Sequence, residues 1–146
     1  MEIRFLEKGG MLWNELKEYA TNCSWDAGKY LAKDMDDGYF TDWQGVFAVL
    51  DEGKICGFCN VIKEDCVPGK PYTPYIGYVF VGEEHRGQRL SGKMIDKANE
   101  YLKGVGFDRT YLISSHNGLY EKYGYTPFDE GDTTFGDHVK FYYKDI

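Results

Sequence analysis

The residues best suited to chemistry are concentrated in one stretch, VGEEHRGQRLSGKM, which runs from Val81 to Met94. It places four basic side chains among small residues, where a β-rich run gives way to a helical pattern. A helix start leaves N–H groups without partners and carries partial positive charge, so phosphates bind there. The stretch therefore predicts a phosphate-binding turn, with an exposed basic loop as the alternative. The four basic residues are His85, Arg86, Arg89 and Lys93.

This turn matches neither of two common phosphate motifs. No Gly-Lys-Ser/Thr follows it, as in a P-loop, and the Gly-x-Gly-x-x-Gly of dinucleotide-binding proteins is missing. The chain as a whole is acidic, with 17 basic and 24 acidic residues and a formal charge of −7. That charge disfavours nonspecific binding to nucleic acid or to an anionic membrane, and it slightly favours a cationic acceptor such as an amine.

Length and composition indicate a single folded domain over residues 1–146. Hydrophobic residues make up 42% of the sequence, enough for a packed core. No apolar run approaches the roughly 18–20 residues that a membrane span needs. The N-terminal residues MEIRFLEKGG lack the features of a signal peptide, so we expect a cytoplasmic protein.

Hydrophobic periodicity predicts the elements that position the turn. Three strands in succession should form an antiparallel meander, and a strand–helix–strand crossover should place parallel neighbours in the same sheet. The expected fold is α/β, a mixed and mostly antiparallel sheet with helices on both faces. Ser24 could cap the second helix, Gly38 could end it, and Gly104 could end the third. The predicted elements are a strand in MEIRFLE, helices over Met11–Asn22 and Asp26–Asp37, two strands joined by a turn at Asp51–Lys54, a loop in VPGKPYTP, a strand in YIGYVFV, a helix over Ser91–Lys103, a strand in RTYLIS, a short helix in NGLYEKYG, and a final strand in HVKFYYKDI paired with YTPF.

Four cysteines are present, and two of them form the sequence CGFC. This pair lies in a predicted strand, where an offset of three residues puts Cys56 and Cys59 on opposite faces. A redox or zinc pair instead needs a turn or a helix start. We therefore interpret them as reduced core cysteines. No metal-binding cluster is visible in the sequence.

Two motifs in order, YVFVGEEHRGQRLSGKMI and NGLYEKYGYTPF, resemble those of the GNAT superfamily of acetyl-CoA-dependent N-acetyltransferases. The resemblance is clearest from Tyr75 to Phe128. The pyrophosphate motif of this superfamily is usually Arg/Gln-x-x-Gly-x-Gly/Ala. Here Arg86 occupies its first position, Arg89 stands where Gly is commonest, and Ser91 stands where Gly or Ala is usual. Its second motif ends in Leu-Tyr-x-x-x-Gly-Phe, and this chain has Tyr125 in the Phe position.

The resemblance implies that the turn binds the pyrophosphate of coenzyme A and that the pantetheine arm lies along the strand carrying Val79 and Val81. Family members splay this strand from its neighbour, and a backbone N–H near Val81 would then face the thioester oxygen. The implied cofactor-binding residues are Val79, Val81, Arg86, Gly87, Gln88, Arg89, Leu90, Ser91, Gly92 and Asn117.

The resemblance also implies that Tyr120 is the general acid that protonates the leaving thiolate, because its phenol has an ordinary pKa near 10. The identity of the general base stays open. Glu64 and Asp65, near the end of a neighbouring strand, are candidates, and an ordered water is another. Glu83, Glu84 and His85 are expected near the phosphates instead, and His116 and His138 are expected to be structural.

The acceptor should lie between the two N-terminal helices and the splayed sheet. Aromatic residues could line this site and hold a cation or an aromatic amine. We therefore expect an N-acetyltransferase acting on a primary amine by direct attack. A non-catalytic acyl-CoA sensor and a nucleotide-phosphate binder are the alternatives, and dimers are frequent in the superfamily. The candidate wall residues are Trp13, Trp25, Tyr39, Trp43, Tyr72 and Tyr75.

Overall fold

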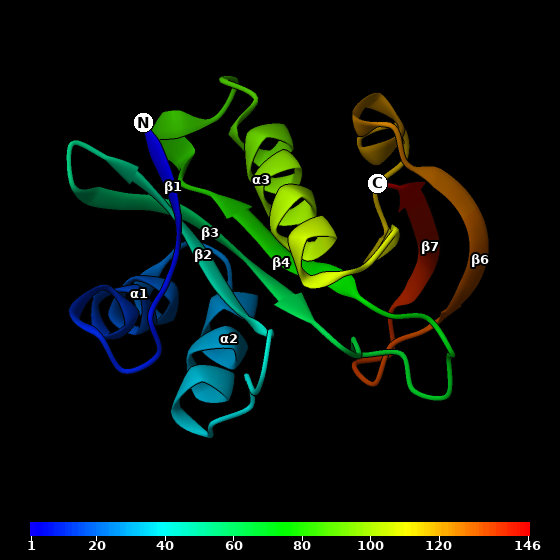
Figure 1. Cartoon of the computed structure of the whole chain (residues 1–146), viewed down its shortest axis with the longest axis horizontal. Helices are drawn as coiled ribbons and strands as arrows, with labels where there is room; N and C mark the ends of the chain where they lie inside the picture. The colour runs from blue at the N-terminus through cyan, green and yellow to red at the C-terminus, as the bar shows by residue number, and fades with distance from the viewer. The chain divides into compact units, whose positions relative to one another are not determined.

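A computed structural model describes residues 1–146, and its elements run from β1 at the N-terminus to β7 at the C-terminus (Figure 1). The strands are hydrogen-bonded in the order β1-β2-β3-β4-β5-β7-β6, so the sheet is mixed. The elements are β1 (Glu2–Phe5), α1 (Met11–Asn22), α2 (Ala27–Asp36), β2 (Gly45–Asp51), β3 (Lys54–Ile62), β4 (Tyr75–Val81), the 3₁₀ helix η1 (Glu83–His85), α3 (Leu90–Val105), β5 (Arg109–Ser114), the 3₁₀ helix η2 (Tyr120–Tyr123), β6 (Thr126–Asp132) and β7 (His138–Asp145).

Two compact units make up the chain. The first contains Met1–Asn60 and Tyr78–Lys97, and the second contains Val61–Gly77 and Ala98–Ile146. The phosphate-binding turn predicted after β4 belongs to the first unit, whereas Tyr120 belongs to the second.

In the first unit, β1 pairs antiparallel with β2, from Glu2 opposite Leu50 to Phe5 opposite Phe47. Consecutive residues of β2, Gly45 to Leu50, are all buried. Because successive strand residues point to opposite faces, both faces of β2 are covered. The two N-terminal helices α1 and α2 lie side by side (Figure 1), and each turns a stripe of apolar residues inward, including Leu16 and Leu31.

In the second unit, β7 is paired antiparallel on both sides. It pairs with β5 from Arg109 opposite Asp145 to Ser114 opposite Lys140, and with β6 across a register shift between Pro127 and Asp129. The strand β4 runs parallel to β5, with Tyr75 opposite Tyr111. This parallel pair follows from the strand–helix–strand crossover, which returns the chain in the same direction.

Most sequence predictions of secondary structure are confirmed, including the mixed sheet and the β2–β3 turn. At that turn Glu52 and Gly53 both have positive φ, as the tight turns of hairpins require. Two predicted helix boundaries are wrong. The N-cap of α2 is Asp26, not Ser24, and α3 runs past Gly104 to Val105, before Gly106 with φ 124°. Gly104 remains within the last turn of α3, because Gly106 supplies the positive φ at which the helix ends.

All four cysteines are free, and Cys56 and Cys59 are buried in β3. Burial raises the pKa of the Cys59 thiol to about 12, so this thiol stays protonated near neutral pH. That agrees with a packing role and not with redox chemistry. No helix is both long enough and apolar enough to span a membrane.

Candidate functional site

The turn between β4 and α3 is built mainly by backbone geometry. After Val81, the Gly82 N–H donates to the Cys56 carbonyl oxygen at 2.7 Å, which ties the start of the turn to β3. The 3₁₀ helix η1 follows, and then Gly87 takes a positive φ of 84°. The first turn of α3, Leu90 to Gly92, comes next. Helix first turns present N–H groups that no carbonyl of the helix can reach, so this segment has the features of an anion site.

The Arg86 side chain folds back onto the end of β4. Its Nε donates a hydrogen bond to the Val81 carbonyl oxygen at 3.0 Å, and its guanidinium lies 5.7 Å from the centre of the Phe80 ring. These contacts fix the direction of an otherwise exposed side chain. They occupy only one of its five N–H donors, so the remaining donors can bind an anion.

Arg89 has a left-handed backbone, with φ 58°. Its carbonyl accepts the first hydrogen bond of α3, from the Lys93 N–H at 3.1 Å. Residues other than glycine pay roughly 1–2 kcal/mol in this conformation. The backbone therefore explains why glycine suits this place in a phosphate turn, and it shows that this chain keeps the conformation despite having an arginine there.

Among the acidic residues and the histidine of the turn, His85 has a side-chain partner. His85 Nε2 lies 2.9 Å from Asp51 Oδ2, at the end of β2. Glu83 and Glu84 are exposed on η1. The prediction that these three residues lie beside the phosphate turn is consistent with their place in η1, and His85 is engaged by Asp51.

Inside β4, Tyr78 also has a positive φ, of 46°. A non-glycine residue in this conformation within a strand marks a local interruption of the ladder, a feature common next to active sites. Other aromatic rings gather beside it: Trp25, just before α2, packs edge-on against Tyr78 and stacks on Phe80 of β4 and Phe58 of β3. In the sequence, the only local indication of this irregularity is Gly77, directly before Tyr78.

The same face of the first unit carries a pocket of about 600 Å³. Its apolar surface includes Tyr19, Ile55 and Phe80, and its charged side chains are mostly carboxylates. The sequence analysis did not predict this pocket, because its lining residues come from segments that are far apart in the chain. The lining residues are Glu15, Glu18, Tyr19, Asn22, Cys23, Ser24, Gly53, Lys54, Ile55, Phe80, Gly82 and Glu83.

In the second unit, Tyr120 begins η2 and is half-buried. Its ring lies 6.2 Å from that of Tyr123 and 6.0 Å from that of Tyr142 in β7. The short helix predicted in NGLYEKYG is closed by Gly124, with φ 88°. Glu121 accepts a hydrogen bond from the Gly118 N–H at 3.2 Å, which fixes the entry into η2. Several side chains therefore determine where Tyr120 lies.

Tyr125, which replaces the family's phenylalanine, has a specific set of partners. Its hydroxyl receives a hydrogen bond from Asn99 Nδ2 at 3.1 Å and lies 2.8 Å from Thr110 Oγ1. Thr110 also donates to Asn99 Oδ1 at 2.7 Å. All three residues are buried, so the polar atoms satisfy one another away from water. The extra hydroxyl of Tyr125 is thus matched by two polar partners and anchors the exit from η2.

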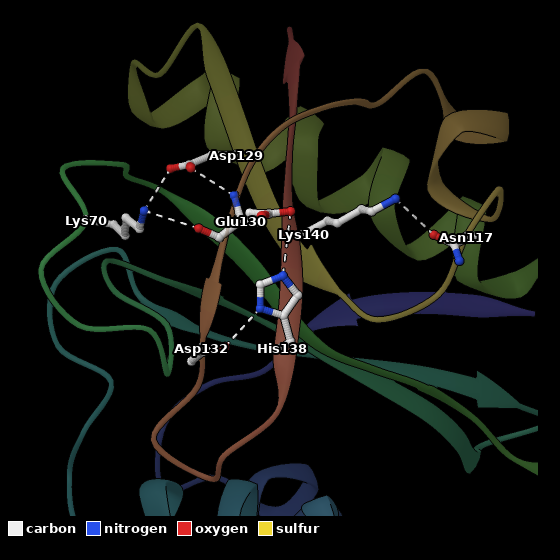
Figure 2. A network of polar contacts seen from close by, with 7 residues as sticks. All are labelled: Lys70, Asn117, Asp129, Glu130, Asp132, His138 and Lys140. Carbon is white, nitrogen blue, oxygen red and sulfur yellow. Dashed lines mark hydrogen bonds and ion pairs between the residues drawn. The ribbon is translucent and has the colours of Figure 1, made fainter.

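Asn117 lies in the exposed loop before η2, where its Oδ1 accepts a hydrogen bond from Lys140 Nζ at 3.2 Å (Figure 2). Figure 2 also shows His138 between two carboxylates on the neighbouring hairpin, with Nδ1 2.9 Å from Asp132 Oδ1 and Nε2 3.6 Å from Glu130. Hydrogen bonds to Asp132 and Glu130 raise the pKa of His138. These contacts suit the structural role predicted for His138.

The base candidates differ in environment. Burial raises the pKa of the Asp65 carboxyl, whose Oδ1 accepts a hydrogen bond from the Cys66 N–H at 2.7 Å. Glu64 is exposed.

The six aromatic residues predicted to wall an acceptor site have different environments. Trp13 is buried against Phe40 in the first unit. In the second unit, Tyr75 is buried, and Tyr72 donates a hydrogen bond to Asp129 Oδ2 at 2.7 Å. Trp25 is partly exposed and belongs to the ring cluster beside β4. None of the six lines the pocket of the first unit, whose aromatic residues are Tyr19 and Phe80.

Solved structures with the same fold include several acetyltransferases. The aminoglycoside 6'-N-acetyltransferase from Enterococcus faecium aligns with a TM-score of 0.73 at 16% identity, over 99% of this chain and 97% of that one. A GNAT family acetyltransferase from Elizabethkingia anophelis with acetyl-CoA bound gives 0.70 at 15%, over the same shares of the two chains. An aminoglycoside 6'-N-acetyltransferase complexed with coenzyme A gives 0.72 at 15%, again over 99% and 97%.

These structural likenesses establish the fold alone, because the identities are low. A comparison with curated proteins found no match. The sequence itself matches the profile of the acetyltransferase (GNAT) family over residues 9–125, which includes both the turn after β4 and the Tyr120 segment. The chain therefore belongs to the GNAT acetyltransferase family.

Proposed function

We propose that this protein is an acetyl-CoA-dependent N-acetyltransferase that transfers the acetyl group to a primary amine by direct attack. The observation that carries the proposal is the family match over residues 9–125, which spans both predicted motifs. Structures of the same fold contain coenzyme A or acetyl-CoA, and two are named as aminoglycoside 6'-N-acetyltransferases.

The turn after β4 suits the pyrophosphate of coenzyme A. Its left-handed residues Gly87 and Arg89 turn the chain into α3, and a Cβ built on Gly87 would meet no atom within 4 Å, so the backbone there is open to a ligand. The N–H groups of Gln88 to Gly92 would bind the phosphate oxygens. Arg86, Arg89 and the Ser91 hydroxyl would add donors, and the guanidinium groups would offset the protein's overall negative charge.

Acetyl-CoA would supply the activated acetyl group as its thioester. We propose that Val79 and Val81 direct its arm along β4, and that a backbone N–H of this strand stabilises charge on the thioester oxygen. Such a donor typically contributes about 3–4 kcal/mol in a transition state. Asn117 is proposed as a further cofactor contact in the second unit.

Tyr120 is the proposed general acid. As the neutral amine attacks the acetyl carbon, the carbon–sulfur bond breaks and the sulfur takes up the proton of the Tyr120 hydroxyl. The attacking nitrogen loses a proton to a base or to water, so the products are an N-acetylamine and coenzyme A. A phenol is a suitable donor because its ordinary pKa of about 10 lies close to that of a thiol, about 8.5.

A panel of amines assayed for release of the coenzyme A thiol tests this function. We expect thiol release with at least one primary amine, and none with the corresponding tertiary amines. Tight acetyl-CoA binding without thiol release across a broad panel would instead favour a non-catalytic acyl-CoA sensor. Displacement of acetyl-CoA by ATP would favour a nucleotide-phosphate binder.

A further inference from the structure

The pocket of the first unit has a strongly negative rim. Glu15 and Glu18 lie three residues apart on α1, which puts them on the same face of the helix. Glu83 adds a third carboxylate from η1, and Lys54 is the single basic residue in the lining. Glu15, Glu18 and Glu83 are exposed and form no ion pair with the protein.

The floor of the pocket is apolar and neutral. It includes Ile55 and Phe80, and Trp25 stacks on the Phe80 ring with centroids 6.0 Å apart. Burial, followed by smaller contributions from nearby thiols, raises the pKa of Tyr19 to about 12, so its phenol carries no charge near neutral pH. A Cβ built on Gly82 would lie 2.9 Å from the Tyr19 hydroxyl oxygen, so this hydroxyl sits directly against the start of the turn.

A ligand that fits these surfaces has a hydrocarbon body and several positive charges. The body would lie on the apolar surface of Tyr19, Ile55 and Phe80. The positive charges would pair with carboxylates that have no other partner. An anionic ligand would be repelled by the rim, and an uncharged one would leave all three carboxylates unmatched.

We propose that this pocket binds the acceptor of the acetyl transfer and selects a flexible amine that carries at least two positive charges, such as a linear polyamine, over a monoamine. The proposal rests on the proposed function for its chemistry, since the bound amine is the group to be acetylated. Binding itself can be measured without turnover, so the two proposals can fail separately.

Isothermal titration of the full chain with spermidine, and with n-octylamine as a monoamine of similar length, tests the selection. We expect spermidine to bind at least about tenfold more tightly, because it can form several ion pairs with the rim at once whereas a monoamine can form one. The preference should shrink as salt is raised. Equal affinities for the two amines would overturn the proposal.

Variants then test the location. Glu15→Gln combined with Glu18→Gln should weaken spermidine binding by about tenfold and leave n-octylamine binding within about twofold. The matched control replaces two exposed carboxylates outside the pocket, Glu7→Gln with Glu100→Gln, and should leave both affinities unchanged. Both double variants change the net charge by the same amount, so equal losses would show that long-range charge alone attracts the amine, and the pocket assignment would be wrong.

Thiol release separates the two proposals. If spermidine binds as expected but no amine gives thiol release, the proposed acetyl transfer fails while the binding site stands. If monoamines and polyamines are acetylated with equal kcat/KM, and the pocket variants have no effect on either, the acceptor assignment fails while the enzyme activity stands.

Discussion

The turns that follow β4 and β5 are both built around short 3₁₀ helices, yet they are held in different ways. After β4, the shape comes from backbone angles at Gly87 and Arg89 and from the Gly82 N–H bonded to β3. After β5, it comes from side chains: Tyr120 packs on two tyrosine rings, and Tyr125 joins a buried hydrogen-bonded set.

This difference explains which amino-acid substitutions each turn tolerates. A site formed by main-chain N–H groups keeps its form when a side chain changes, so arginine can stand where family members most often have glycine. A turn that is held by the packing of its side chains needs particular residues together. The family motif is accordingly altered at Arg89 without loss of the backbone conformation, whereas Tyr125 is accompanied by Asn99 and Thr110.

The largest effect should come from Tyr120→Phe, which removes one hydroxyl and keeps the ring. We expect kcat to fall about 100-fold, as general acids typically contribute 10²–10⁴-fold, with the acetyl-CoA dissociation constant nearly unchanged. Steady-state kinetics and titration with acetyl-CoA measure the two quantities. Tyr123→Phe, at the adjoining ring, is the control and should retain most activity. A Tyr120→Phe protein with normal kcat would remove Tyr120 from the mechanism.

Arg86→Ala should weaken acetyl-CoA binding by about tenfold, because a hydrogen bond to a charged group contributes roughly 1.5–3 kcal/mol and the backbone donors stay in place. Titration of the protein with acetyl-CoA measures this. Arg4→Ala removes an equally exposed arginine that pairs only with Glu2, and it controls for net charge. An unaltered dissociation constant for Arg86→Ala would exclude this side chain from the phosphate site.

Tyr125→Phe should lower the free energy of unfolding by about 1–2 kcal/mol, because the hydroxyl lost is one of three mutually bonded groups in the core. Denaturant unfolding measures the change. Tyr143→Phe, on a half-buried ring of β7, is the comparison and should cost less. If Tyr125→Phe were neutral, the turn after β5 would depend less on its side chains than we infer.

Arg89→Gly should raise the free energy of unfolding by about 1 kcal/mol, since glycine adopts the left-handed conformation without steric cost. Arg89→Ala removes the same charge but keeps the strain, so the difference between the two variants isolates the backbone contribution. Urea unfolding of both is the measurement. Equal stabilities for Arg89→Gly and Arg89→Ala would argue against a strained turn.

The smallest effect concerns Asp129 on β6, whose carboxyl accepts hydrogen bonds from Tyr72 and Lys70. These bonds, with that from Tyr72 contributing most, lower its pKa from 3.8 to about 2. A lowered pKa stabilises the fold above pH 3.8, and this contribution is lost as the pH falls through about 2. In Tyr72→Phe, carboxyl NMR titration should show the Asp129 pKa rising toward 3.8. No rise would mean that Lys70 and the Glu130 N–H, which also donates to this carboxyl, set its pKa without Tyr72.

Hydrophobic periodicity was sufficient to predict the order of the helices and strands and most of their bounds. The alternation of apolar residues in a strand and their spacing in a helix are both local features of the sequence. Periodicity located the hairpin at Asp51–Lys54 and the strand β4 for the same reason. The two errors at helix ends arose where more than one residue could serve as a cap or a stop: Ser24 competed with Asp26, and Gly104 with Gly106.

The site was only partly predictable. Each of its two motifs is a continuous stretch of sequence and could be recognised. The residues that line the pocket instead come from separate elements, including α1, the β2–β3 hairpin and η1. Glu15 and Glu18 look like ordinary solvated helix residues until the fold brings Phe80 and Glu83 beside them. The left-handed angle at Tyr78 had even less local signal, because tyrosine rarely adopts it.

The position of Arg86 over Phe80 connects the proposed phosphate turn with the pocket. The same ring supports the guanidinium of the proposed phosphate turn and forms part of the pocket floor. If a ligand at one site moves a side chain that supports the other site, the two affinities are coupled, and the coupling is equal in both directions. Occupancy of the pocket should therefore alter the affinity for the cosubstrate by the same factor as the cosubstrate alters affinity for the amine.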